Sequence, residues 1–342
     1  MKKGIILFII LIILVGGFFG YKFYSKYYGN NVEKSGFILV PHNATFKQVL
    51  DSISPYLQNK QQFEEVALSK NLDKNIKAGR YEVKEGNNNT NLVNMIKAGN
   101  QTPNTFRIGD FGDIYQMVGK VSKKTELDSL KFTQEFDKIA ISKGYKNAED
   151  LKKYFFIDSY EFFWTVTPQE FFKKFDDQYN DFWTPERKNK EQQSGLTRDQ
   201  IYALASIVYK ESGGKPDEMK TIAGLYLNRY HKGMKLQSDP TVIYAMNKLT
   251  NFKEPIKRVL YKYLTTPSPY NTYANAGIPP GPICVTDKKS VDAVLNAEKN
   301  HYIFMCADPK RPGLHKFTDS ATEHAINAKA YQDWLNSKNI TK

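Results

Sequence analysis

The chain has 342 residues, of which 41% are hydrophobic and 14% aromatic, enough apolar surface for one or two folded domains and too much for wholesale disorder. The formal net charge of +13 favours polyanionic partners, such as nucleic acid, anionic lipid or an anionic polymer, although lysines spread along the chain also describe a generic solvated surface. None of the usual nucleic-acid-reading motifs is present, so we predict no nucleic-acid partner.

Residues 4–20 form an uncharged apolar run, GIILFIILIILVGGFFG, which aromatic residues follow. About 20 such residues span a bilayer as a helix, and trailing aromatic side chains suit the membrane interface. The alternative is a cleaved signal peptide, whose apolar region would be shorter and would end in small residues. This run ends in bulky Phe and Tyr. We therefore predict a retained transmembrane anchor over residues 1–27.

The orientation of this anchor is only weakly encoded. Lys2 and Lys3 favour a short cytoplasmic N-terminus, but Lys22 and Lys26 lie on the other side of the run. No second apolar run of comparable length follows. We therefore expect everything beyond the anchor to lie on one side of the membrane.

A small α and β unit is expected next, after a polar linker at residues 28–36. The pattern predicts a short buried strand at 37–40, a helix from Phe46 with Thr45 as its N-cap, a helix at 62–69, a strand at 79–83 and a helix that ends at Gly99. Many carbohydrate-binding modules have this strand–helix–helix–strand order, an analogy of fold alone. The unit is assigned to residues 37–105.

Residues 106–195 are predicted to form a mostly helical connecting region. A strand-like segment stands at 161–166, a helix is expected from about Pro168, and the charged stretch 187–195 reads as an exposed connection. The fold class is therefore α+β, with a single transmembrane helix, a small subdomain and a larger mixed helix and sheet domain over residues 196–342.

The most informative helix begins after Thr197, where Thr197 and Gln200 fit a capping box, and is stopped by Gly213. At 100° per residue Glu211 falls between Leu204 and Ile207 on the apolar face. Burial and the negative end of the helix dipole both disfavour the carboxylate, so its pKa is expected to rise, as a general acid requires. The alternative is a helix-end glutamate that reaches solvent or pairs with a lysine.

Polar segments follow this helix. Residues 236–244 read LQSDPTVIY, residues 268–273 read SPYNTY and residues 277–283 read GIPPGPI. Such loops line binding sites on a rigid scaffold, although Pro and Gly also dominate ordinary turns.

The cysteines and histidines show no metal-ligand spacing, so neither a metal nor a cofactor is predicted. Cys284 and Cys306 could form a disulfide in an oxidising compartment, or both could be free thiols.

Taken together, the motifs ASIVYKES, NRYHKGMKLQSDPTVIYAM, SPYNTY and GIPPGPI resemble the endolytic murein transglycosylase (YceG-like) family. The resemblance extends over nearly the whole chain after the anchor and recurs at YIFMCAD and at residues 315–318. It implies a single-pass inner-membrane protein with a periplasmic body and a LysM-like subdomain. Peptidoglycan synthases are candidate partners.

The resemblance also implies the site. Glu211, in the family's K-E-[ST] motif, would be the catalytic residue. The family's substrate-side motifs carry over onto Gln237, Asp239, Thr241, Tyr244, Tyr270, Asn271, Thr272, Tyr273, His315 and Phe317.

The expected activity is cleavage of the bond between N-acetylmuramic acid and N-acetylglucosamine in nascent glycan strands, with 1,6-anhydro ends that terminate strand elongation. Two alternatives stay open. One is a lysozyme-like hydrolase with Asp239 as its second carboxylate, and the other is a non-catalytic peptidoglycan-binding scaffold.

Overall fold

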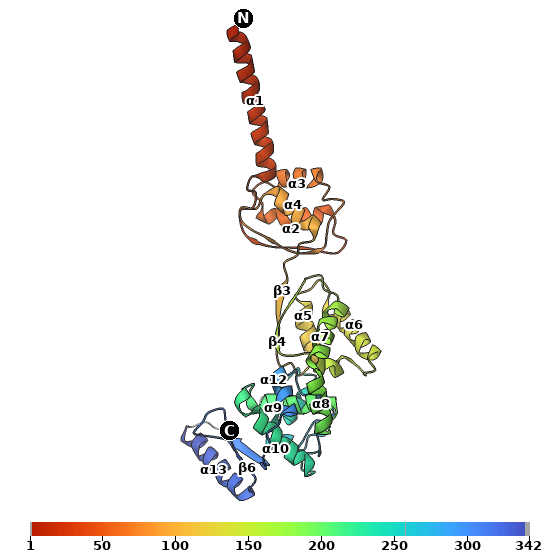
Figure 1. Ribbon diagram of the computed structural model, residues 1–342, viewed down its shortest axis with the longest axis vertical. Coiled ribbons are helices and arrows are strands. Elements are labelled where there is room, and N and C mark those ends of the chain that lie inside the picture. Colours follow the sequence, from red (N-terminus) through yellow and green to blue (C-terminus); the bar gives the residue numbers. More distant parts are fainter. Residues whose placement is uncertain (1, 257, 339–342) are drawn as a thin grey trace. The chain divides into compact units, whose positions relative to one another are not determined.

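The computed structural model describes residues 2–256 and 258–338, which form two compact units (Figure 1). Unit 1 contains the chain through Phe106 together with Ser122–Asp128 and Glu161–Thr167. Unit 2 contains Arg107–Val121, Ser129–Tyr160 and the chain from Pro168. Across the described residues, helices predominate and the strands form three two-stranded sheets. The predicted mixture of helices and strands is confirmed.

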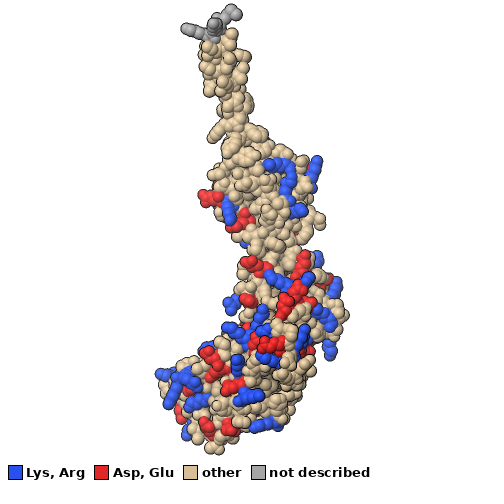
Figure 2. Space-filling model, in the orientation of Figure 1, with Lys and Arg blue, Asp and Glu red and all other residues tan. Residues whose placement is uncertain are grey.

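Unit 1 begins with helix α1 (Lys2–Tyr28), whose apolar side chains are exposed along its length. Figure 2 shows this helix as a surface almost without charge, whereas basic and acidic residues intersperse over the visible face of unit 2. In the described part of the chain, α1 alone is long and apolar enough to cross a membrane. A signal sequence near the N-terminus would meet the same criterion of length and hydropathy.

The rest of unit 1 is a two-stranded sheet packed on short helices. Its elements are β1 (Gly36–Val40), α2 (Phe46–Ile53), η1 (Ser54–Tyr56), α3 (Lys60–Ser69), β2 (Gly79–Val83) and α4 (Asn89–Ala98). β1 and β2 pair antiparallel, with Ile38 opposite Tyr81. The predicted strand at 37–40 is confirmed, but it is buried on one face and not on both. One face of β1 is open, so Ile38 and Val40 are buried while Phe37 and Leu39 are exposed.

Within the predicted linker at residues 28–36, Asn31 and Val32 are buried in unit 1. The Asn31 side-chain amide donates to Asn89 Oδ1 (2.6 Å) and to the Asn59 carbonyl (2.9 Å). Polar asparagines suggested solvent exposure, but here an amide satisfies buried polar groups of its neighbours.

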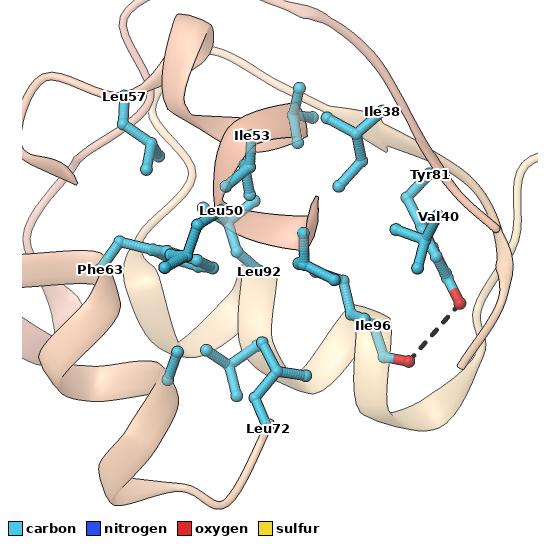
Figure 3. Close-up of a cluster of buried hydrophobic side chains, with 14 of the residues drawn as sticks. Ile38, Val40, Leu50, Ile53, Leu57, Phe63, Leu72, Tyr81, Leu92 and Ile96 are labelled. Carbon is cyan, nitrogen blue, oxygen red and sulfur yellow. Dashed lines mark hydrogen bonds between the residues drawn. The ribbon is translucent and has the colours of Figure 1, made fainter. Parts of the chain in front are cut away.

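The core of unit 1 is a cluster of aliphatic and aromatic side chains from all its elements (Figure 3). Leu92 of α4 and Phe63 of α3 are fully buried in it. The Tyr81 ring is buried as well, and its hydroxyl donates to the Lys77 carbonyl (2.8 Å). The one polar atom on this ring is therefore paired, as burial requires.

Unit 2 and the strands that link it to unit 1 contain the remaining elements. They are β3 (Asn104–Ile108), α5 (Ile114–Ser122), α6 (Ser129–Ser142), η2 (Ala148–Tyr154), β4 (Asp158–Phe162), α7 (Pro168–Phe182), α8 (Pro185–Ser194), α9 (Arg198–Ser212), η3 (Pro216–Glu218), α10 (Met219–His231), α11 (Asp239–Leu249), η4 (Tyr261–Tyr263), α12 (Lys288–Leu295), β5 (Phe304–Ala307), β6 (His315–Thr318) and α13 (Ala321–Ser337). β3 pairs with β4, and β5 pairs antiparallel with β6. The predicted helix from Pro168 is confirmed. The predicted strand at 161–166 begins and ends earlier, as β4.

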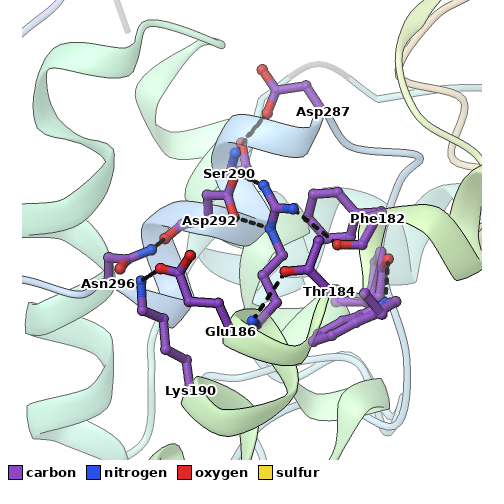
Figure 4. A network of polar contacts seen from close by, with 11 residues as sticks. Phe182, Thr184, Glu186, Lys190, Asp287, Ser290, Asp292 and Asn296 are labelled. Atoms are coloured by element: carbon purple, nitrogen blue, oxygen red, sulfur yellow. Dashed lines mark hydrogen bonds and ion pairs between the residues drawn. The ribbon is translucent and has the colours of Figure 1, made fainter.

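The expected exposed connection at 187–195 is instead part of helix α8. Pro185 stands at its first turn, and the Thr184 side chain accepts from the Arg187 amide (3.4 Å). No residue of α8 is buried, so its sequence lacks the apolar periodicity that marks most helices. The Arg187 guanidinium holds α8 to α12 through two hydrogen bonds to Asp292 (2.7 and 2.9 Å; Figure 4).

We predict that Leu92→Ala lowers the free energy of unfolding of unit 1 by about 2–5 kcal/mol, because it leaves a cavity in a closed core. The matched control is Leu68→Ala on α3, a leucine that is 46% exposed, whose effect should stay within about 0.5 kcal/mol. Amide hydrogen exchange of α2, α3 and α4 in the full-length chain measures both. Equal effects of the two substitutions would contradict this account of the core.

Candidate active site

Helix α9 carries Glu211 to the edge of the core of unit 2. The predicted capping box is confirmed, since the Thr197 hydroxyl accepts from the Gln200 amide and the Gln200 side chain accepts from the Thr197 amide. The helix packs against α10, α11 and α12, and every residue from 201 to 208 is buried. It ends at Gly213, whose φ of +60° favours glycine. Glu211 therefore leaves the packed core in the last turn.

Two buried hydroxyl groups hold the Glu211 carboxyl. Tyr226 of α10 donates to Glu211 Oε1 at 2.7 Å, and Ser238 donates to the same oxygen at 2.6 Å. Burial raises the pKa of Glu211, which the two hydroxyls and the positive form of His315 oppose. Lys210, the adjacent residue, pairs with Asp110 instead (2.5 Å). The predicted direction of the pKa shift is thus confirmed, with burial as its main cause.

Glu211 opens into a cavity of about 350 Å³. Its walls come from α10, from residues 236–239 at the start of α11, from Tyr273 in a loop, and from β5, β6 and α13. The lining residues are Glu211, Leu225, Tyr226, Arg229, Leu236, Gln237, Asp239, Tyr273, Ile303, Phe304, Met305, Cys306, Ala307, His315 and His324.

Four of the residues predicted on the substrate side meet in this cavity with Glu211. They are Gln237, Asp239, Tyr273 and His315. The Tyr273 hydroxyl donates to Asp239 Oδ1 (2.7 Å), and the negative charge of Asp239 contributes to the raised pKa of Glu211. The cavity therefore holds two carboxylates in different surroundings.

Gln237 has a φ of +53°, an uncommon conformation for a residue with a side chain. Its amide donates to the Thr272 carbonyl (3.1 Å), and its side-chain oxygen accepts from the Arg229 guanidinium. Contacts from two elements thus hold this backbone at the rim of the cavity. Uncommon backbone conformations that the surrounding contacts hold in place cluster at functional sites.

Three other predicted residues support the cavity from behind. Thr241, Asn271 and Thr272 are buried. The Ser238 amide donates to the Thr272 hydroxyl (3.0 Å), and the Thr241 hydroxyl donates to the Ser238 carbonyl (2.7 Å). This network fixes the position of Ser238 and, through it, one of the bonds to Glu211.

Tyr244, Tyr270 and Phe317 do not line the cavity. The Tyr244 ring packs edge to face on Tyr270 at 4.7 Å, and its hydroxyl accepts from buried Lys152 (2.8 Å). Phe317 stacks on Tyr302. These three residues stand in the same motifs as residues that line the cavity. The motifs alone therefore did not reveal that their side chains lie outside it.

Several cavity residues were missed by sequence reasoning. Ser238 and Tyr226 donate to Glu211, yet Ser238 stood unremarked between Gln237 and Asp239, and Tyr226 lies outside the motifs that carry the resemblance. The wall from β5 and His324 gave no signal, because it depends on how β5 lies beside Arg229 of α10 and on how α13 packs on β5. Arg229 could have been suspected, since a cation on a mostly apolar helix face is rarely buried without a role.

The two cysteines are free thiols, which decides between the two alternatives that the sequence left open. Burial raises the pKa of the Cys284 thiol to about 12, so this thiol is unreactive. Within the described residues no group of three or more His, Cys, Asp and Glu side chains is placed to hold a metal ion.

Fold and site together define an α+β protein with one half-buried carboxyl of raised pKa at a helix end, which opens into a cavity. A family model described as the YceG-like family matches residues 38–330. The chain belongs to this family, and the prediction from its motifs is confirmed.

Two relatives and one solved structure extend the comparison. An endolytic murein transglycosylase of Bacillus subtilis (strain 168) is 32% identical over 226 residues, which are 66% of this chain and 59% of the relative. One of Streptococcus pneumoniae serotype 2 (strain D39) is 30% identical over 143 residues, 42% of this chain and 25% of the relative. The matches thus span less than two thirds of each relative. The crystal structure of a YceG-like protein from Listeria monocytogenes has a similar fold, with a TM-score of 0.57 at 24% identity over 86% of this chain and 98% of that chain.

We predict that Glu211→Gln is increasingly stabilising as the pH rises. The folded state raises the pKa of Glu211 above its ordinary 4.5, so the wild-type fold loses stability as the pH rises from that value through the raised pKa. Glutamine cannot ionise, and its oxygen can still accept from Tyr226 and Ser238. Thermal unfolding of both full-length proteins across a pH series measures the difference.

Glu254→Gln, at an exposed glutamate of the same unit, is the control. The difference between wild type and this control should not change with pH. A Glu211→Gln difference that is flat, or that shrinks as the pH rises, would contradict the assigned environment.

Proposed function

We propose that this chain is an endolytic lytic transglycosylase that cleaves peptidoglycan between N-acetylmuramic acid and N-acetylglucosamine. The observation that carries the proposal is the environment of Glu211, a half-buried carboxyl with a raised pKa that opens into a cavity. A larger fraction of such a carboxyl is protonated near neutral pH, as a general acid must be. Family membership and the names of the two relatives support the same activity.

In the proposed reaction Glu211 serves twice. Its proton passes to the glycosidic oxygen as the bond from C1 to that oxygen breaks, and the N-acetyl group helps to stabilise the developing oxocarbenium ion. The oxygen of the sugar's own 6-hydroxyl then bonds to C1, and its proton returns to Glu211. This internal nucleophile has a high effective concentration, which favours ring closure over attack by water.

The contacts of Glu211 suit both roles. Burial favours the protonated form before cleavage, while the hydroxyls of Tyr226 and Ser238 can stabilise the anion that follows. Both hydroxyls bind Oε1. Oε2 is the oxygen we assign to proton transfer with substrate.

We assign substrate contacts to the predicted residues that line the cavity. Gln237 and the Asp239–Tyr273 pair would bind sugar hydroxyl and amide groups at its rim, because they are hydrogen-bonding groups held in fixed positions. Thr241, Asn271 and Thr272 would act only through the backbone that they hold. Tyr244, Tyr270 and Phe317 could contact sugars only beyond the cavity.

The lysozyme-like alternative has one observation in its favour. Asp239 lies in the same cavity as Glu211, so a second carboxylate is present after all. However, Asp239 starts helix α11, is exposed and accepts from the Tyr273 hydroxyl. We favour ring closure, and the two reactions give products that differ by one water.

We further propose that unit 1 is a LysM-like module that contacts glycan. Its order of strand, two helices and antiparallel strand supports this reading. On the open face of β1 the guanidinium of Arg80 lies 3.4 Å from the centre of the exposed Phe37 ring, so an aromatic and cationic surface is available to a sugar.

The predicted domain limits at 37–105, 106–195 and 196–342 are retained as a proposal. We also retain as a proposal the partnership with peptidoglycan synthases, which would supply the glycan strands. Cleavage of nascent strands would then end their elongation.

We predict that the full-length chain releases fragments with 1,6-anhydro-N-acetylmuramic acid ends from uncrosslinked glycan strands, through cuts at internal bonds. Mass spectrometry of the fragments decides, since hydrolysis would give reducing ends heavier by one water. Glu211→Gln, which should stay folded, is expected to lower the rate by about 10²–10⁴-fold. Reducing ends would favour the hydrolase, and strands left intact by the wild-type chain would favour the scaffold.

A topology prediction follows from α1 and from the place of peptidoglycan outside the membrane. We expect α1 to be a retained anchor in the cell membrane, with the N-terminus cytoplasmic and the body extracytoplasmic. A reporter fused after Lys342 that works only outside the cytoplasm should be active, and the chain should stay in the membrane fraction. A soluble, shortened chain would instead show that α1 is a cleaved signal.

A further inference from the structure

Glu218 and His315 form a half-buried pair at the edge of the Glu211 cavity. The Glu218 carboxylate accepts from the His315 backbone amide (2.9 and 3.0 Å) and from the ring nitrogen Nδ1 (2.9 Å). The two side chains are only 13% and 17% exposed. His315 lines the cavity, whereas Glu218 does not. Neither the motifs nor the mechanism above uses Glu218.

This double contact fixes the imidazole. Because a carboxylate only accepts, Nδ1 must carry the proton in this pair. Rotation of the ring by half a turn would break the Nδ1 contact, while the backbone contact keeps the start of β6 in place. The other ring nitrogen, Nε2, is then left for the cavity. A carboxylate that orients a histidine in this way sets which nitrogen is offered to a reacting group.

We propose that Glu218 is a positioning residue, which holds the His315 ring at the cavity so that the ring, in its positive form, stabilises the Glu211 carboxylate between the two proton transfers. The inference rests on the proposed function of Glu211. His315 keeps its own protons throughout, so the balance of the reaction is unchanged. The positive form of His315 already favours ionised Glu211 in the free protein, as the direction of its influence on the pKa of Glu211 shows.

The charges around the pair agree with this role. Glu218 on η3 also faces Arg311, whose guanidinium donates to the His315 carbonyl (3.2 Å). On the cavity side the ionisable groups are Glu211 of α9, Tyr226 and Arg229 of α10, Asp239 of α11, Tyr273, Cys306 of β5 and His324 of α13. Of these, Asp239 acts on Glu211 in the opposite direction to His315. His315 is thus placed to offset the repulsion between the two carboxylates.

The test is a double-mutant cycle on the full-length chain with glycan strands as substrate. Glu218→Gln should lower kcat by about 10- to 100-fold, the factor that a hydrogen bond to a charged group contributes, with a smaller change in KM. In a His315→Gln background the same substitution should change kcat by less than about twofold, because Glu218 acts through His315. Asp217→Asn, at the exposed neighbouring carboxylate on η3, is the matched control and should have no effect.

The pH profile adds a second readout. Loss of the positioned imidazole should raise the pKa of Glu211 further, so the alkaline limb of kcat/KM should move to higher pH in Glu218→Gln and in His315→Gln alike. If Glu218 had a purely structural role, the alkaline limb would stay in place. The loss of kcat in Glu218→Gln would then persist in the His315→Gln background. Either result overturns the proposal, as does full activity of Glu218→Gln.

A readout without catalysis separates this proposal from the proposed function. Nitrogen NMR of labelled histidine in the full-length chain, recorded at a pH where the imidazole is neutral, should show His315 with its one proton fixed on Nδ1, and Glu218→Gln should give a mixture of tautomers. An unchanged tautomer overturns the positioning role. If Glu211→Gln remains active while the tautomer shifts as expected, the proposed function fails instead.

Discussion

The site depends on a balance at one oxygen atom. Burial at the end of α9 drives Glu211 towards its protonated form, while Tyr226 and Ser238 donate to Oε1 and favour the anion. Neither effect alone would serve the proposed role of Glu211, in which the group gives up a proton and takes it back. A carboxyl buried without donors would hold its proton too tightly, and one fully exposed would be ionised at neutral pH.

Much of unit 2 maintains this balance. Ser238 is held by the network of Thr241 and Thr272, and α9 is aligned by its capping box and by the helices that pack on it. At Gly224 of α10 an added Cβ would lie 2.3 Å from the Glu298 carbonyl oxygen, so only glycine permits this approach. Since Tyr226 follows two residues later on the same helix, the packing of α10 also places a donor to Glu211. Residues that never meet substrate can therefore alter catalysis by moving a hydroxyl group by a fraction of an ångström.

Glu211 could be predicted from the sequence because its evidence is local. The capping box, the apolar stripe and the stop at Gly213 lie within 17 residues and fix its face of the helix. The cavity walls could not be predicted, since β5, β6 and α13 reach Glu211 only through the tertiary fold. Polar motif residues were also ambiguous: Asp239 faces the cavity, whereas Thr241, two residues later, is buried and supports a loop. Similarly, α8 was missed because a helix that buries nothing has no periodic pattern.

A second carboxylate in the cavity does not by itself make a hydrolase. A retaining glycosidase needs that group as a nucleophile, and an inverting one needs it as a base for water, so in either case it must act freely at C1. Asp239 instead accepts from Tyr273 and sits in the first turn of α11, where the helix dipole stabilises its negative charge. The same negative charge raises the pKa of Glu211, so Asp239 helps to keep the proton on the carboxyl beside it, and this suits the proposed reaction, in which a single carboxyl carries the proton both ways.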